Sequence, residues 1–262
     1  MSFTITRRDA GESARVIAAG ARHVAPVGEL AEYDMWLVYE PLIDLADGHV
    51  RGHQARLRAA DRRGMVVDRR TIVSNAAERG VADLLQSWIC DEALAAGGGD
   101  TFMAIGVSAA QLAFEDDAQD LLDLVAASDR APGDLQLEFD ARSSPAMNAT
   151  PGLEILARAG VRLALGGFGD GCWTFADVAR LPVTDVKIAR SLIAAAHVDA
   201  DARKRLRSVA NRLAALGVTV TARGIERPAH LGLLRGLPVE LGQGPLFCRG
   251  AHIAMGAQHA IN

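Results

Sequence analysis

VRLALGGFGDGCWTFADVARLPVTDVKI, residues 161–188, is the stretch that decides the fold. The apolar run 161–165 predicts a buried strand, and the glycine-rich segment 166–171 ends it abruptly. A helix is predicted over 173–180 and a second strand over 183–188. Parallel neighbours in one sheet need a long crossover connection, usually a helix, whereas antiparallel neighbours can be joined by a short turn. Two strands that are joined through a helix are therefore expected to lie parallel in one sheet. The stretch therefore predicts a strand–helix–strand unit of an α/β protein.

The same alternation continues along most of the chain. Near the start, 36–45 and 49–59 predict two antiparallel strands, because Ala46-Asp47-Gly48 between them favours a tight turn. About eight strands within roughly 230 residues fit one (β/α)8 barrel better than an open sheet. Further strands are predicted at 101–108, 135–139, 218–222 and 239–244, and helices at 71–96 (in two pieces around Gly80), 114–128, 152–160, 200–216 and 228–235.

The composition describes a chain with a large core and no bias toward a polyanionic partner. Of 262 residues, 50% are hydrophobic and 23% charged, and the formal net charge is −4. Both signs are mixed along the chain, so neither a nucleic acid nor an acidic membrane is an expected partner. The start lacks the apolar segment of a signal peptide, and no apolar run approaches the roughly 18 residues of a membrane span. Cys90, Cys172 and Cys248 lie far apart and form no metal-binding pair, so we expect no zinc site. Together these observations predict a cytoplasmic protein.

The carboxyl ends of the predicted strands hold the residues to consider for function, because barrel proteins place their sites there. Only Glu138 and Glu226 are suited to be central carboxylates, and the cations Lys187 and Arg223 share the same rim. A two-metal site needs several converging oxygen ligands, so the residue types alone argue weakly for metal. The full set of strand-end residues is Gln54, Arg56, Arg58, Gly106, Ser108, Glu138, Asp140, Gly166, Gly167, Lys187, Arg223, Glu226 and Gln243.

The glycine-rich segment GGFGDG at 166–171 leaves two interpretations open. It lacks the third glycine of a dinucleotide-binding loop, because Cys172 stands there, and no Gly-Lys-Ser/Thr follows as in a phosphate-binding loop. One interpretation is a tight turn that uses glycine where φ is positive. The other is a loop that has lost the side chains of a ligand site.

Eight segments of the chain carry a family resemblance. They are VYEPLIDL (38–45), GHQARLR (52–58), IGVSAAQL (105–112), LQLEFD (135–140), GVRLALGGFGDGCWTF (160–175), LPVTDVKIARSLI (181–193), VTVTARGIE (218–226) and LGQGPLFCRG (241–250). In this order they resemble the motifs of EAL domains, the cyclic di-GMP phosphodiesterases. The resemblance implies a (β/α)8 barrel with an irregular, antiparallel first strand. It places the barrel at 34–262, behind an N-terminal helical extension at 1–33.

The resemblance also implies which site residues are kept and which are replaced. Kept are Glu138, Lys187, Glu226 and Gln243, of which the lysine orients the attacking water in the family. Four replacements fall on metal ligands of the family: Gln54 stands in place of a Glu, Gly106 in place of an Asn, and Gly166 and Gly167 in place of two Asp. Two more change a charge, because Ala189 stands in place of an Asp and Arg223 in place of a Glu. We therefore expect neither a Mg²⁺ or Mn²⁺ cofactor nor phosphodiesterase activity.

Two interpretations of the remaining cations stay open. In the first, the chain is a metal-independent receptor for cyclic di-GMP and Arg58 meets a phosphate, because a guanidinium offers a fork of donors. The resemblance places Pro41, Leu57, Arg58, Phe168 and Gln243 at or near the nucleotide. Lys187 and Arg223 are further candidate contacts, as counter-charges to the phosphates in place of metal ions. In the second, the cations close an ion-pair network of their own while Arg56 fills the pocket. That network would pair Arg58, Lys187 and Arg223 with Glu40, Glu138 and Glu226.

The leading functional hypothesis is a regulator in, or derived from, cyclic di-GMP signalling that works through protein contact. Residues 166–180 match the surface through which the family usually dimerises, and Trp173 and Phe175 make it more aromatic here. A homodimer through 166–180 and a regulatory protein partner are therefore expected, with internal packing of both aromatic side chains as the alternative. Residual phosphodiesterase activity is the third hypothesis. The arginine-rich stretches 61–70 and 202–207 are expected to be solvated faces.

Overall fold

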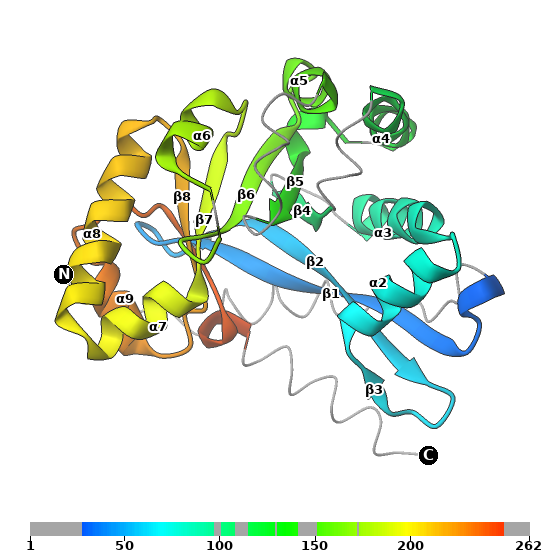
Figure 1. Cartoon of the computed structure of the whole chain (residues 1–262), viewed down its shortest axis with the longest axis horizontal. Coiled ribbons are helices and arrows are strands. Elements are labelled where there is room, and N and C mark those ends of the chain that lie inside the picture. The colour runs from blue at the N-terminus through cyan, green and yellow to red at the C-terminus, as the bar shows by residue number, and fades with distance from the viewer. Residues whose placement is uncertain are drawn as a thin grey trace.

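The structure is a computed structural model, and it describes residues 28–96, 101–107, 115–128, 130–140, 151–171 and 173–248. In this part of the chain a closed sheet lies inside a ring of helices (Figure 1). Three residues named above, Ser108, Cys172 and the side chain of Asp140, lie outside the described residues, as do residues 1–27 of the predicted extension.

Eight strands close into the barrel that the sequence predicts. β1 pairs antiparallel with β2 on one side and with β9 on the other, and this double pairing closes the sheet. The neighbours from β2 and β4 through to β9 run parallel. A short ninth strand, β3, pairs antiparallel with the far end of β2. The strands are β1 (Tyr33–Asp44), β2 (Val50–Asp61), β3 (Val66–Val67), β4 (Phe102–Gly106), β5 (Leu135–Asp140), β6 (Arg162–Phe168), β7 (Asp185–Ile188), β8 (Thr219–Arg223) and β9 (Leu241–Gln243).

The helices follow the predicted alternation, with one division confirmed and one helix added. The predicted helix over 71–96 is divided at Gly80, whose φ of +71° suits glycine. α7 was not predicted from the sequence, because its N-cap Ala189 provides no side-chain hydrogen bond as a start signal. The helices are α2 (Arg69–Glu78), α3 (Ala82–Ala96), α4 (Glu115–Ala127), α5 (Pro151–Arg158), α6 (Phe175–Arg180), α7 (Arg190–Val198), α8 (Ala200–Ala215) and α9 (Pro228–Leu234), with 3-10 turns at Gly28–Leu30 and Pro132–Asp134. Among the helices described, none combines the length and apolarity that crossing a membrane requires.

The hairpin of β1 and β2 is longer than the barrel needs. Its far end, where Tyr33 pairs with Asp61, extends past the ring of helices, and β3 and α2 pack there (Figure 1). α2 begins after Asp68, whose side chain accepts a hydrogen bond from the Arg70 amide. The sequence analysis did not predict β3, because Val66–Val67 is too short to show a period of two.

Apolar side chains fill the layer between the barrel and the helices, whereas the barrel interior mixes apolar and polar side chains. Leu42, Phe102, Ala104 and Leu241 form a small apolar cluster inside the sheet, beside the buried Gln136 and Thr221. Toward the carboxyl ends of the strands, the interior side chains are mostly polar or charged. Side chains alternate between the two faces of a strand, so an interior polar position is separated from the next by one residue of the outer core.

Candidate functional site

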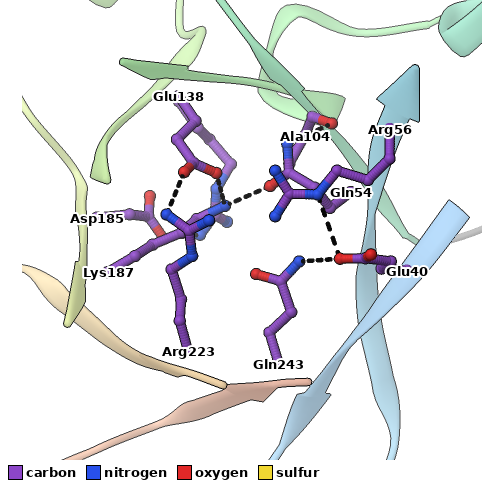
Figure 2. A network of polar contacts seen from close by, with 10 residues as sticks. Glu40, Gln54, Arg56, Ala104, Glu138, Asp185, Lys187, Arg223 and Gln243 are labelled. Carbon is purple, nitrogen blue, oxygen red and sulfur yellow. Dashed lines mark hydrogen bonds and ion pairs between the residues drawn. The ribbon is translucent and has the colours of Figure 1, made fainter. Parts of the chain in front are cut away.

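The polar side chains of the interior converge near the carboxyl end of the barrel, as Figure 2 shows, and they come from six strands. In β2, the even-numbered residues Gln54, Arg56 and Arg58 face inward, and Ala55 and Leu57 face the outer core. The other strands contribute Glu40 (β1), Glu138 (β5), Lys187 (β7), Arg223 (β8) and Gln243 (β9). We call this group the mouth cluster.

Lys187 lies at the centre of the mouth cluster and is fully buried. Its Nζ donates to Gln54 Oε1 and to Glu138 Oε2, both at 2.8 Å (Figure 2). The Gln54 amide is held in turn by a 3.3 Å hydrogen bond from its Nε2 to the Ala104 carbonyl. Arg223 Nη1 donates to the second oxygen of Glu138 at 3.0 Å. Both carboxylate oxygens of Glu138 are therefore bound to cationic side chains.

A second carboxylate, Glu40, organises the opposite side of the mouth cluster. Its Oε2 accepts from Arg56 Nε at 3.2 Å and from Gln243 Nε2 at 3.1 Å. Arg58 Nη2 lies 3.9 Å from Glu40 Oε1, and the Arg58 side chain is 41% exposed. The ion-pair network that was one of the two interpretations is thus present for Lys187, Arg223 and Arg58. Glu226 lies exposed just after β8, where its backbone N–H donates to His230 Nδ1.

The mouth cluster holds more positive than negative charge. Four cations, Arg56, Arg58, Lys187 and Arg223, face the two carboxylates of Glu40 and Glu138. Burial raises the pKa of Glu138, but Lys187, Arg223 and Arg56 outweigh this effect and lower the pKa to about 2. Burial also lowers the pKa of Lys187, against the opposing attraction of Glu138. Glu138 is therefore an anion at neutral pH, and the cluster as a whole is cationic.

Glycine suits the backbone at two positions of the mouth, and a third glycine lies beside an arginine. A Cβ at Gly166 would collide with Glu138 Oε1, and Gly167 has a φ of +75° at a bulge between Gly166 and Phe168. A Cβ at Gly106 would lie 3.6 Å from Nη2 of Arg69, the first residue of α2. Arg69 is thus a fifth cation at the mouth. The sequence analysis placed Arg69 on a solvated face, and its side chain is exposed. Its position beside Gly106 follows only from the tertiary fold, which brings the start of α2 close to β4.

Comparison with known proteins identifies the family. The EAL domain model matches residues 28–250. The chain belongs to the EAL domain family. Among curated relatives, the cyclic di-GMP phosphodiesterase NbdA of Pseudomonas aeruginosa is 28% identical over 238 residues, which cover 86% of this chain and 30% of that protein. This EAL domain therefore spans about a third of the length of that relative.

Two solved structures share the fold of this EAL domain over most of their length. The PaMucR phosphodiesterase in complex with c-di-GMP gives a TM-score of 0.73 at 24% identity, over 81% of this chain and 90% of that chain. The FimX EAL domain of Pseudomonas aeruginosa bound to c-di-GMP gives a TM-score of 0.73 at 19% identity, over 82% of this chain and 89% of that chain. At these identities the likeness concerns the fold.

The described residues of this EAL domain do not fit the divalent metal that the family implies. No three His, Cys, Asp or Glu side chains among them are grouped so that they could hold an ion. Mg²⁺ and Mn²⁺ prefer several oxygen ligands, and both oxygens of Glu138 already accept from Lys187 and Arg223. Gly166 and Gly167 offer no side-chain oxygen, and Ala189, 2% exposed, offers none at the end of β7.

Three residues predicted to contact a nucleotide are not brought to the mouth of this EAL domain. Leu57 is 3% exposed and packs in the outer core, because it lies on the opposite face of β2 from Arg56 and Arg58. Pro41 follows Glu40 on β1 and by the same alternation faces away from it. Phe168 is 4% exposed and packs its ring 5.1 Å from that of Phe175. The bulge in β6 moves Phe168 out of the inward register.

The aromatic residues of the 166–180 segment are packed within the chain. Trp173 is 6% exposed. Phe175 lies between Phe168 and the Arg212 guanidinium, which is 3.7 Å from the centroid of its ring. Internal packing was the alternative to a contact surface for Trp173 and Phe175, and the structure has this arrangement.

Proposed function

We propose that this EAL domain does not hydrolyse cyclic di-GMP and acts as a regulator in cyclic di-GMP signalling through protein contact. The observation that carries the proposal is the engagement of both Glu138 oxygens by Lys187 and Arg223. Family membership supports the link to signalling, because relatives are named as cyclic di-GMP phosphodiesterases or as complexes with c-di-GMP.

Electrostatics supports the absence of a metal-dependent step. An ion that bound Glu138 would have to displace Lys187 or Arg223, or lie beside them. Two unit charges of the same sign about 4 Å apart repel by roughly 4 kcal/mol at an effective dielectric constant of about 20, and a divalent ion doubles this. A side chain at position 166 would also require Glu138 to move, since its Cβ would collide with Glu138 Oε1.

The test is a hydrolysis assay on the purified chain. Cyclic di-GMP is incubated with the protein and with Mg²⁺ or Mn²⁺, and the linear dinucleotide is measured by liquid chromatography, with an active EAL phosphodiesterase as positive control. We expect no product above the rate without protein. Metal-dependent product formation would overturn the proposal and establish the residual phosphodiesterase instead.

A second candidate function is metal-independent binding of cyclic di-GMP, and the charge of the mouth cluster favours it. Four cations against two carboxylates leave an excess that two phosphates would neutralise. Arg58 is half exposed and only loosely paired with Glu40, so its guanidinium is available to a phosphate. Opposing this function, Glu40 places a negative charge among the same groups.

Calorimetric titration separates the two candidate functions. Cyclic di-GMP is titrated into the chain with and without Mg²⁺, and into an Arg58→Ala variant. Arg51→Ala is the matched control, because Arg51 is a similarly exposed arginine that pairs with Asp44 and Asp47 at the other end of the barrel. Binding that Mg²⁺ does not alter, that Arg58→Ala weakens by at least tenfold and that Arg51→Ala preserves would establish the receptor. No heat at high ligand concentration would leave the contact-based function.

A further inference from the structure

One side of the molecule is formed by β3, α2, α3 and α4. These elements follow one another in this order, and each helix contacts the next (Figure 1). β3 is attached through β2, which also contacts α2. We call this side the lateral face. It carries groups of charged side chains of opposite sign at its two ends and exposed apolar side chains between and beside them.

The basic end of the lateral face lies around β3 and the start of α2. Arg62, Arg63, Arg69 and Arg70 are exposed there. Arg62, Arg63 and Arg70 form no ion pair with any other residue that the structure describes. The segment 61–70 stays basic, because its four arginines outnumber its two acids, Asp61 and Asp68. Asp61 forms no ion pair with these arginines and accepts from the backbone amides of Arg63 and Met65. Asp68 likewise accepts from the Arg70 amide.

The acidic end lies on α4. Glu115, Asp116, Asp120 and Asp123 are exposed, and no lysine or arginine of the described residues pairs with them. Acids in the first turn are stabilised by the helix dipole, but Asp120 and Asp123 lie beyond that turn. Asp83, at the start of α3, adds to the repulsion on Asp117, whose pKa is raised by burial and by Asp83, Asp120 and Asp116.

The apolar side chains of the lateral face are the third observation. Six large hydrophobic side chains are exposed in the described part of the chain, and four of them lie here. Met65 and Val66, at the tip before and within β3, are 66% and 76% exposed. Val73 on α2 and Leu84 on α3 are 41% and 58% exposed. This concentration in one region contrasts with the scattered single exposures that are ordinary on a protein surface.

We infer that the lateral face binds the lateral face of a second copy of this chain about a twofold axis near Leu84. In such an isologous dimer, the basic end of each copy meets the acidic end of the other, and the contact forms twice. Leu84 and Val73 of the two copies meet in the middle and are removed from water. An acidic partner would match only the arginines and a basic partner only α4, whereas a second copy matches both ends. The inference goes beyond the proposed function, and its test uses no nucleotide.

Sedimentation velocity of the full chain tests the inference at about 100 µM protein, in about 50 mM and about 500 mM NaCl. We expect a dimer at low salt whose dissociation constant rises at least tenfold at high salt, because exposed ion pairs are screened. A monomer in both buffers would overturn the inference. Species that grow beyond the dimer with concentration would also overturn it, since they indicate a head-to-tail contact that does not close.

Charge reversal gives a sharper test. One variant changes Arg62, Arg63 and Arg70 to Glu, so that both ends are negative, and the other changes Asp116, Asp120 and Asp123 to Lys, so that both ends are positive. Each variant alone is expected to be monomeric at low salt, and an equimolar mixture is expected to form a one-to-one heterodimer. Failure of the mixture to associate, although both variants show the thermal unfolding of the wild type, would contradict the inference.

Two further variants locate the contact. Leu84→Ser is expected to weaken the dimer at least tenfold. Its matched control is Leu216→Ser, which changes a leucine that is 38% exposed at the C-cap of α8, outside the lateral face, and this control is expected to leave the dimer unchanged. Ala176→Arg alters the exposed surface of α6, in the segment first expected to dimerise. A dimer that is lost in Ala176→Arg and kept in Leu84→Ser would place the interface at 166–180 and overturn the inference.

Discussion

The two ends of the barrel interior use the same kinds of side chain in different proportions. At the amino end, the fully buried Asp185 accepts from Arg162 at 2.7 Å, and Arg51 pairs with Asp44 and Asp47. Acids outnumber cations there. At the carboxyl end, two carboxylates are shared by four cations. Strand β7 contributes to both ends, because Asp185 belongs to the amino-end ion pair and Lys187, two residues later, belongs to the mouth cluster.

This difference separates charges that are balanced within the fold from charges that are not. Each acid at the amino end has a cation or backbone amides, and the Arg162 guanidinium also lies 4.4 Å from the Phe102 ring centroid. This arrangement needs no ligand to be balanced. The mouth cluster has fewer anions than cations, with two carboxylates shared by four cationic side chains. This imbalance is the observation behind the proposals that the domain binds no divalent metal ion and that an anion could bind there.

The largest expected effect is the loss of the carboxylate on which the mouth cluster depends. Glu138→Gln leaves Lys187 buried and Arg223 without its partner, so we expect the free energy of unfolding to fall by about 3–5 kcal/mol. Urea denaturation followed by circular dichroism measures it. Adding Lys187→Met should recover a large part of the loss, because no uncompensated buried ammonium remains. A loss of less than about 1 kcal/mol in the single variant would mean that Glu138 is not the shared counter-charge.

Acid titration should affect the mouth cluster through the same carboxylate. The pKa of Glu138 is about 2 in the folded chain against an ordinary 4.5, so its contribution is complete above pH 4.5 and is lost as the pH falls toward 2. The difference corresponds to about 3 kcal/mol. We expect the wild type to lose this much more stability than Glu138→Gln between about pH 5 and 2, measured by urea denaturation at each pH. Parallel pH profiles would contradict the assignment.

At the amino end, removing one partner of the buried ion pair should lower the free energy of unfolding by less. Arg162→Met removes the partner of Asp185 and a cation–π contact, and we expect a loss of about 1–3 kcal/mol, because Arg162 is 31% exposed and water can reach its place. Thr184 Oγ1 still donates to Asp185. Thermal and urea unfolding measure the effect. A loss equal to that of Glu138→Gln would show that the two ends of the barrel are energetically alike.

The smallest effect is expected at the outer pair of the amino end. Arg51 is 52% exposed and its pairs with Asp44 and Asp47 are screened by water, so Arg51→Ala should lower the free energy of unfolding less than any of the changes above. The same denaturation series measures it. A larger loss would show that this pair supports the β1–β2 turn more than its exposure suggests.

The barrel could be predicted from local patterns, because each strand and helix has its own period and the strand ends point to one rim. The inward set Gln54, Arg56 and Arg58 also follows from alternation alone. Three features could not be read from the sequence. The bulge at Gly167 turns Phe168 outward, β3 is too short to have a pattern, and the approach of Arg69 to Gly106 depends on how two distant segments pack.

Binding of Mn²⁺ to the purified chain, followed by the electron paramagnetic resonance of the free ion, tests most directly whether Lys187 and Arg223 take the place of metal at Glu138. The signal of free Mn²⁺ is compared with and without an equimolar amount of protein. We predict that the two signals are equal. A stoichiometric loss of the free-ion signal that Glu138→Gln abolishes would contradict the proposal that side-chain cations hold this carboxylate.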